Sequence, residues 1–238
     1  MFKAFNVGVL ALLLAACGAP RPRPAPQIPA KPAPTPNIAL PASAYRIDAN
    51  LSELRILVYR AGPLARLGHN HVMVNRALRG SVRAEAGASL FWLKVPVAGF
   101  VVDDVQARRE EGGEFEGEIS DDAKSGTLHN MLSAALLDAD RFPEISIDCI
   151  GISPGTYANG AGAVTATVAI RVAGHQSTIE VPATIQSDSR QVSATGSLDL
   201  RQSALGLTPY SLMLGALQVQ DAMTIKFRII AEASQEPV

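Results

Sequence analysis

The chain has 238 residues, of which 47% are hydrophobic, and its 21 Lys and Arg nearly balance its 22 Asp and Glu. Only two cysteines occur, Cys17 and Cys149, which excludes a small fold held together by several disulfides. Four of the cationic residues precede residue 43 and every acidic residue follows it, so the remainder carries a net charge of about −5. Such an acidic remainder argues against nucleic-acid binding, which requires clustered Lys and Arg.

Residues 1–16 predict a signal peptide. A short cationic segment is followed by an apolar run over residues 7–16, well below the ~20 residues that span a membrane. The run ends in Leu14-Ala-Ala-Cys17, which resembles the bacterial lipobox, so we expect Cys17 to carry acyl chains. The alternative is an ordinary secretory signal with a chance cysteine. Because Gly18 stands where an inner-membrane retention signal has an acidic residue, we expect a lipid anchor in the outer membrane, on the periplasmic side of the envelope.

Residues 17–42 predict a tether. Proline occupies nearly every second or third position between Ala19 and Ala42, and such a segment adopts extended polyproline II rather than a core. At ~3.1 Å per residue, this segment would reach up to about 75 Å. We therefore expect a stand-off between the membrane anchor and the domain at residues 43–238.

Residues 43–238 predict one domain large enough to bury a core. Its apolar residues mostly alternate with polar ones, the period of half-buried strands, and turn signals such as Asn159-Gly160 separate the runs. Cys149 lies on the apolar side of its run and is expected to be a buried structural thiol. The predicted strands are residues 45–47, 54–58, 81–85, 91–102, 145–150, 164–172, 178–185, 191–200 and 218–230. Many strands at short spacing favour a sandwich or a closed barrel.

A helical insertion is predicted before the strand at 145–150. Ser120-Asp-Asp122 has the pattern of an N-cap with an acidic first turn. Gly126 is expected to divide the insertion into two short helices, and Pro143 to end it. The apolar face of the insertion consists of Leu128, Met131, Leu132, Ala135 and Leu136. A helical segment that lies between strands and has one apolar face could close the open end of a barrel.

Four segments, in order, are similar to those of one family. They are Tyr45-Arg-Ile-Asp48, residues 136–145 (LLDADRFPEI), residues 168–181 with a turn at Gly174, and residues 198–207 (LDLRQSALGL). Together they resemble the YceI-like polyisoprenoid-binding family, and the likeness extends from Tyr45 to Ala231. The resemblance implies a mainly β fold: an antiparallel, lipocalin-like barrel with a short helical insertion closing one end.

The resemblance also implies non-catalytic binding or transport of an isoprenoid or quinone-like lipid inside the barrel, with no other cofactor. Each buried CH₂ group contributes ~0.8 kcal/mol to such binding. The residues expected to line the site are Leu128, Met131, Leu132, Leu136, Phe142, Ile145, Ile147, Leu205 and Leu207. A composition rich in Ala and Val and poor in aromatics favours a hollow interior. The alternative, a filled core in a purely structural envelope protein, stays open.

The chain departs from the family's pattern in two places. The Arg-Asp-x-His-Leu run that precedes the family's aromatic pair is replaced by residues 125–132, so a head-group contact made there would differ. Leu136 and Leu137 replace that aromatic pair, and Leu205 replaces a late aromatic residue. These changes predict a wider pocket or a ligand of different shape.

Gly68-His-Asn-His71 is the most distinctive polar segment. On a strand, His69 and His71 would point to the same face. Together with Arg60 or Arg66, they could hydrogen-bond a quinone oxygen or a phosphate at the barrel mouth.

The alternative function is a periplasmic metal-binding module. His69 and His71 would be ligands, and His129 or His175 could contribute further ones. A His-x-His pair needs at least one such additional ligand from elsewhere in the chain.

No catalytic residue is expected. Residues 151–155 match Gly-x-Ser-x-Gly, but Pro154 lacks the N–H that an oxyanion hole would use. The alternating Glu114, Glu116 and Glu118 predict the solvent face of a strand rather than a buried acid–base pair. The head group and the oligomeric state stay open.

Overall fold

Alternating apolar and polar residues form long antiparallel strands in the computed structural model, which describes residues 45–83, 90–154 and 162–233. The predicted signal peptide, Cys17 and the tether lie outside the described residues. The strands are β1 (Tyr45–Ile47), β2 (Glu53–Ala61), β3 (His71–Asn75), β4 (Arg79–Arg83), β5 (Leu90–Pro96), β6 (Phe100–Val102), β7 (Glu144–Pro154), β8 (Ala163–Val172), β9 (His175–Ser187), β10 (Gln191–Arg201), β11 (Ser211–Leu212) and β12 (Leu217–Ala233). The α-helices are α1 (Val105–Glu111) and α2 (Asp121–Leu132).

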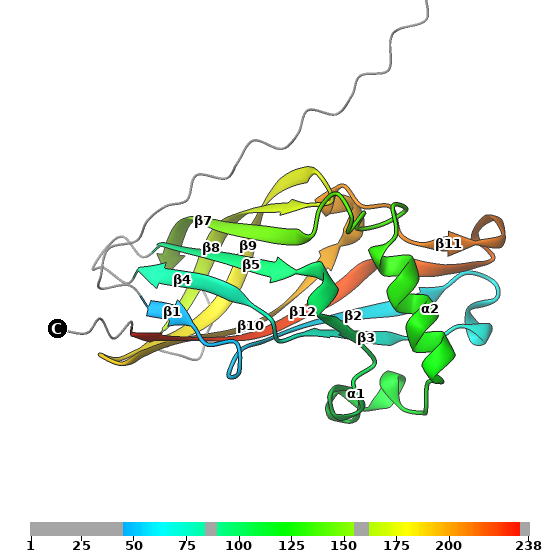
Figure 1. The fold of residues 1–238 in the computed structure, drawn as a ribbon, viewed down its shortest axis with the longest axis horizontal. Coiled ribbons are helices and arrows are strands. Elements are labelled where there is room, and N and C mark those ends of the chain that lie inside the picture. Colours follow the sequence, from blue (N-terminus) through cyan, green and yellow to red (C-terminus); the bar gives the residue numbers. More distant parts are fainter. Residues whose placement is uncertain (1–44, 84–89, 155–161, 234–238) are drawn as a thin grey trace, which may run out of the picture. The chain divides into compact units, whose positions relative to one another are not determined.

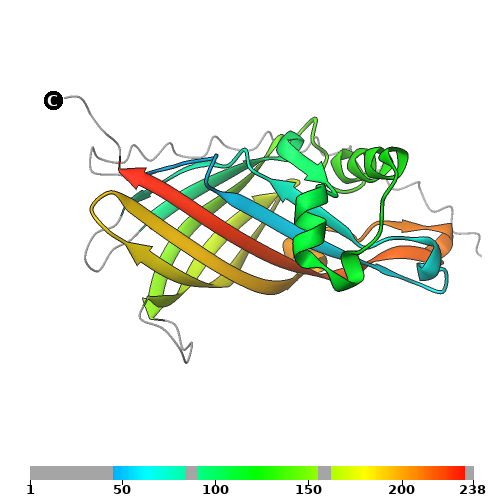
Figure 2. The ribbon, with the colours of Figure 1, turned by 90° about the horizontal axis from the view of Figure 1, so that it is seen from below.

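Eight strands close into an antiparallel barrel. Their order is β1-β4-β5-β7-β8-β9-β10-β12, and β12 pairs back with β1 (Figures 1 and 2). The long β12 pairs with β1 through Ala231–Ala233 and with β2 through Gln218–Arg228. From β12 the sheet also continues through β2 and β3 to β6, so β1, β4 and β5 belong to the closed ring whereas β2, β3 and β6 extend from it. The expected mainly β, lipocalin-like barrel is confirmed.

The predicted strand at 91–102 is interrupted. A 3₁₀ turn at Val97–Gly99 separates β5 from β6, and the buried Asn75 side chain donates to the Pro96 carbonyl at 2.8 Å. A Cβ on Gly99 would lie 3.0 Å from the Ala77 Cβ, so glycine lets the two bends approach each other. The bend redirects the chain from the barrel wall to the extension beside β3.

The strand that the alternating glutamates predicted does not form, because Glu114, Glu116 and Glu118 lie in a 3₁₀ turn over Gly113–Phe115 and the irregular segment after it, where all three are exposed. Before them, the Asp104 side chain accepts from the Ala107 N–H at 2.9 Å and caps helix α1. Under α1, a small second core forms from Leu57, Val72, Val74, Ala107 and Phe115.

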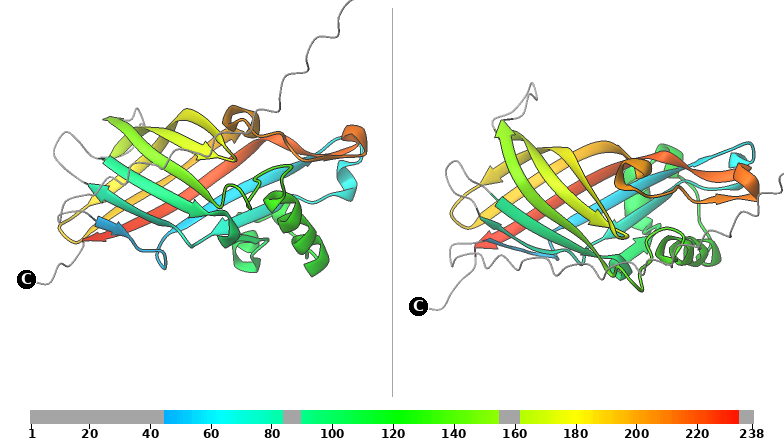
Figure 3. Two further views of the ribbon diagram at one scale, coloured as in Figure 1. Left: turned by 45° about the horizontal axis from the view of Figure 1, so that its top comes forward. Right: turned by 90° about the horizontal axis from the view of Figure 1, so that it is seen from above.

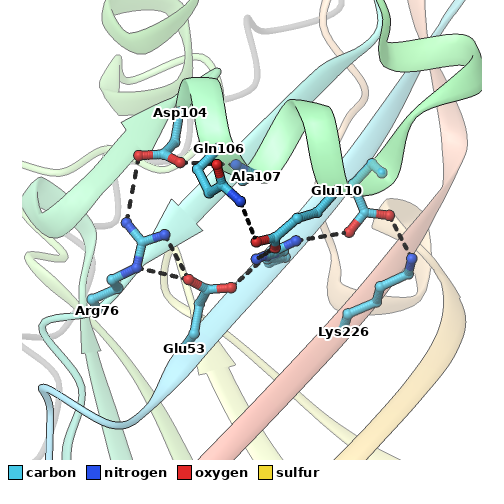
Figure 4. A network of polar contacts seen from close by, with 9 residues as sticks. Glu53, Arg76, Asp104, Gln106, Ala107, Glu110 and Lys226 are labelled. Atoms are coloured by element: carbon cyan, nitrogen blue, oxygen red, sulfur yellow. Dashed lines mark hydrogen bonds and ion pairs between the residues drawn. The ribbon is translucent and has the colours of Figure 1, made fainter.

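Ion pairs fasten α1 to the outer face of the sheet (Figure 4). Arg55 on β2 pairs with Glu53, Glu110 and Glu111, and Lys226 on β12 pairs with Glu111. On the other side, Arg76 contacts Glu53 at 2.6 Å and Asp104 at 3.6 Å. The network draws α1, β2 and β12 together, which fixes the residues at the start of α1.

Helix α2 begins as predicted and continues further than predicted. The Ser120 hydroxyl accepts from the Ala123 N–H at 3.2 Å, which confirms the N-cap. The expected break at Gly126 is wrong, because a single helix runs to Leu132. Leu136 lies in the turn that follows. No helix in the described ranges is both long and apolar enough to cross a membrane.

Candidate functional site

A cavity of about 500 Å³ lies inside the barrel. Every second residue of the strands faces it, as the two-residue period of a strand requires. From β8 the lining residues are Val164, Ala166, Val168, Ile170 and Val172, and from the part of β12 after its register shift they are Met223, Ile225, Phe227 and Ile229. The volume falls within the ~300–1,000 Å³ of ligand pockets. The barrel is therefore hollow rather than filled.

Small side chains widen the cavity along β9 and β10. Ala183 on β9 and Ala194 on β10 both face the interior, close to the hairpin that joins these strands. Their outward neighbours, Thr184 and Thr195, are exposed and pair with each other. Larger side chains at the two alanines would occupy the space that a ligand would use.

A β-bulge changes which residues of β7 face the cavity. The register shifts between Cys149 and Gly151, so Ile145 and Ile147 line the cavity below it and Ile152 above it. Cys149 is half-buried rather than buried. Burial raises the pKa of its thiol, which disfavours the thiolate needed for nucleophilic chemistry.

The segment from α2 to the following turn closes part of the mouth. Thr127, Asn130 and Met131 of α2 line the cavity, as do Leu136 and Leu137 beyond it. Because Leu137 N–H donates to the Met131 carbonyl at 3.2 Å, the turn folds back against the helix end. The helical insertion thus contributes lining side chains, as expected for a barrel cap.

Six of the nine residues predicted to line a lipid site do line the cavity. They are Met131, Leu136, Ile145, Ile147, Leu205 and Leu207. Leu128 and Leu132 pack against the main core without facing the cavity. The ring of Phe142 lies against Gly174, with the Arg141 guanidinium 5.1 Å from its centroid. The one-face helical pattern missed the lining residues Thr127 and Asn130 because they are polar.

At the mouth, Arg60, His69 and His71 line the cavity, whereas Arg66 is exposed and does not. His71 begins β3, a strand that the alternation rule missed because its interior residues are buried on both faces. Its Nδ1 lies 2.6 Å from Asp103 Oδ2, and its Nε2 lies 3.5 Å from the Thr127 hydroxyl. His71 therefore presents its Nε2 to the cavity, while Asp103 holds the ring through Nδ1.

Asp103 anchors this arrangement. Its other oxygen accepts from the Val72 N–H at 3.0 Å and from Arg108 at 2.6 Å. Burial raises the pKa of the Asp103 carboxyl, but hydrogen bonds from His71, Val72 and Arg108 outweigh this effect and bring the pKa below its ordinary 3.8. An ionised Asp103 only accepts hydrogen bonds, so His71 Nδ1 carries the proton. In neutral His71, Nε2 is then an acceptor directed toward the cavity.

The structure does not support the alternative metal site, because His69 and His71 find no third ligand among the described residues. Their rings are 6.0 Å apart at their centroids. His129 and His175 are exposed, and the His175 ring lies beside Gly206. Within residues 45–83, 90–154 and 162–233, no cluster of three or more His, Cys, Asp or Glu side chains could hold a metal ion.

Comparison with known proteins agrees with this architecture. A family model described as the YceI-like domain matches residues 45–231. The structure of Burkholderia cenocepacia BcnA is similar with a TM-score of 0.55 at 15% identity, covering 78% of this chain and 99% of that chain. A Campylobacter jejuni YceI protein gives a TM-score of 0.46 at 9% identity, covering 68% and 85%. No curated protein matches the sequence.

Proposed function

The chain belongs to the YceI-like family, and on that premise we propose that its barrel binds, without converting it, a long apolar lipid of the isoprenoid or quinone type. The observation that carries the proposal is the hollow interior, lined almost entirely by aliphatic side chains. Binding there removes apolar ligand surface from water, at ~25 cal/mol per Å². We further propose that the protein acts on the periplasmic side of the envelope, anchored through an acylated Cys17.

The energetic cost of an empty interior supports a ligand. The cavity opens at its mouth, so its aliphatic lining faces water when no ligand is bound, and apolar surface left against water costs ~25 cal/mol per Å². An apolar guest that covered this lining would offset much of that cost.

The polar mouth favours a ligand with a hydroxyl head group. His71 Nε2 lies at the cavity surface, where it accepts a hydrogen bond whenever His71 is neutral, and Asp103 fixes the ring's orientation. A prenol or quinol hydroxyl could donate to it in place of the distant Thr127 hydroxyl. A ligand lacking such a donor would leave this nitrogen without a strong partner.

Solvent extraction followed by mass spectrometry tests the proposal. Full-length protein purified from its native envelope is expected to yield about one apolar lipid per chain. The Ala183→Phe/Ala194→Phe variant places two large side chains in the cavity and should yield far less lipid. Thr184→Phe/Thr195→Phe, which adds the same groups on the outer face, should retain the lipid. Wild-type protein that yields no lipid, or equal yields from both variants, would contradict the proposal.

A further inference from the structure

Two loops pack together at one end of the barrel and form what we call the tip, defined as residues 62–68 and 211–216. Leu64 N–H donates to the Ala216 carbonyl at 2.8 Å. A Cβ on Gly62 would lie 2.6 Å from the same carbonyl oxygen, so glycine permits this close approach. The views agree that the two loops lie side by side, at the end opposite to β1 and to the last residues of β12 (Figures 1 and 3).

The tip exposes large apolar side chains. The exposed fraction is 61% for Leu67, 45% for Leu212, 73% for Met213 and 108% for Leu214. Met213 and Leu214 have φ angles of 51° and 57°, in the left-handed region that disfavours residues other than Gly, Asn and Asp. Holding two apolar residues there costs ~1–2 kcal/mol each. Strained backbone that presents apolar side chains to solvent indicates a binding role.

The two chain segments that contain the tip carry charge of one sign, and the acidic Glu114 and Asp221 bond to their outer residues Asn70 and Ser203 rather than to the tip. Residues 60–71 contain Arg60 and Arg66 and no acidic residue, and residues 202–220 contain no charged residue. Both arginines are exposed. The rest of the domain is acidic, so the tip is a cationic and apolar end on a molecule that otherwise repels anionic surfaces.

The cavity extends to this tip. Gly68, Leu212 and Leu217 belong both to the loop region and to the cavity lining, and Arg60 lies beside them. At its other end the lining reaches Ile185 and Val192, near the β9–β10 hairpin. An apolar path therefore leads from the exposed loops into the barrel.

We propose that the tip docks onto an anionic lipid bilayer. Leu67, Met213 and Leu214 insert among the acyl chains, as in proteins that bury apolar groups ~5–10 Å into a membrane interface. Arg60 and Arg66 contact the lipid phosphates, each worth ~1 kcal/mol near an anionic surface. Two narrow, convex loops fit this role better than a protein interface, which buries ~800 Å² per partner.

Docking would let a lipid move between bilayer and cavity without crossing water. This transfer step rests on the proposed function, whereas docking itself stands on the exposure, the backbone strain and the charge of the tip. The two are therefore tested by different readouts.

The docking test uses the full-length chain on vesicles of phosphatidylglycerol and phosphatidylethanolamine. Trp92, the single tryptophan, is replaced by Phe, and a reporter is introduced as Leu214→Trp or, as a matched control, as Ile150→Trp. Ile150 on β7 is also exposed, at 57%, but lies outside the tip. We expect a blue-shifted emission and quenching by brominated acyl chains at position 214 only. Equal quenching at both positions would overturn the proposal.

A second variant separates docking from ligand binding. In the full-length chain carrying Cys17→Ala, which removes the proposed acyl anchor, Met213→Ser/Leu214→Ser should weaken vesicle binding at least roughly tenfold, given the apolar surface lost from the inserted face. In the same background, Arg66→Gln should make the remaining binding less sensitive to salt. Both variants should still yield lipid on extraction. If the reporter at position 214 is quenched but the protein yields no lipid, docking is supported and the proposed function is contradicted. If the protein yields lipid but the reporter is not quenched, the proposed function is supported and docking is contradicted.

Discussion

Asp103 is fully buried and ionised and has a positive φ of 55°. Its backbone turns the chain from β6 into α1, and its carboxylate holds His71 and Arg108 at the same time. Within the described part of the chain, the Nε of Arg108 is the one buried side-chain nitrogen or oxygen that lacks a hydrogen-bond partner. The hydrogen bonds of the Arg108 guanidinium therefore come from its terminal nitrogen Nη1, and Asp103 is the acidic partner of its positive charge.

We predict that Asp103→Asn destabilises the fold without distorting it. Asn has the same shape and tolerates a left-handed backbone, so the change removes the charge and turns one of the two acceptor oxygens into an NH₂ donor. It leaves Arg108 buried without its anionic partner, and breaking a buried pair in this way costs ~3–5 kcal/mol. Urea unfolding at pH 7 should show this loss. Asp104→Asn is the control, because Asn caps a helix as well as Asp does.

The pH dependence of that loss has a defined sign. Because the folded pKa of Asp103 lies below its unfolded value, its stabilisation is fully present above about pH 4 and is lost as the pH falls through the folded pKa. The difference between wild type and Asp103→Asn should therefore narrow below about pH 4. A constant difference across this range would show that Asp103 is not held as a carboxylate.

Sequence reasoning found His69, His71 and Arg60 at the mouth but not Asp103 or Arg108. The His-x-His spacing identified His69 and His71 as candidate site residues. Asp103 is adjacent to Asp104 in an otherwise acidic region, and nothing in that local pattern separates a buried carboxylate from a solvent-exposed one. Its role depends on the pairing of β3 with β6, which brings residues 71 and 103 together across the sheet.

At the scale of elements, long alternating strands were predictable, and so was the three-residue β1, but the short strands β3 and β11 were missed. β8, β10 and β12 were found nearly to their ends because alternation extends over many residues. β3 was missed because it is buried on both faces, and α1 because its cap and its ion pairs, rather than an apolar stripe, define it. Gly126 was over-interpreted, since a glycine in an open helix position lowers stability without ending the helix.

Gly126→Ala should therefore stabilise α2. Gly126 lies inside the helix, with no atom within 4 Å of the Cβ that alanine would add. The free energy of unfolding should rise by ~0.5–1 kcal/mol. Gly174→Ala is the contrasting control, because its φ is 79° and its Cβ would lie 2.7 Å from the Phe142 ring. Thermal unfolding that ranked the two variants in the opposite order would contradict this account of α2.

At the scale of the whole molecule, the closed barrel followed from the many strands and the resemblance, whereas the composition favoured a hollow interior without deciding between a hollow and a filled one. Alternation assigns each side chain to the inside or the outside of a sheet. It does not say whether the inward side chains meet across the barrel, since that depends on the number of strands in the ring and their tilt. With eight strands and small residues such as Ala166, Ala183 and Ala194 on the inner face, they leave a cavity.

Hollowness has a thermodynamic consequence that can be measured with a short prenol. If the cavity is the binding site, farnesol should stabilise the folded chain by RT ln(1 + [L]/Kd), which is ~2.7 kcal/mol at a hundredfold excess over Kd. The Ala183→Phe/Ala194→Phe variant fills that volume itself, so its unfolding midpoint in urea should not respond to farnesol. Thr184→Phe/Thr195→Phe should respond as the wild type does. Equal stabilisation of both variants would place the farnesol on the outer surface, because only the first pair of side chains occupies the interior.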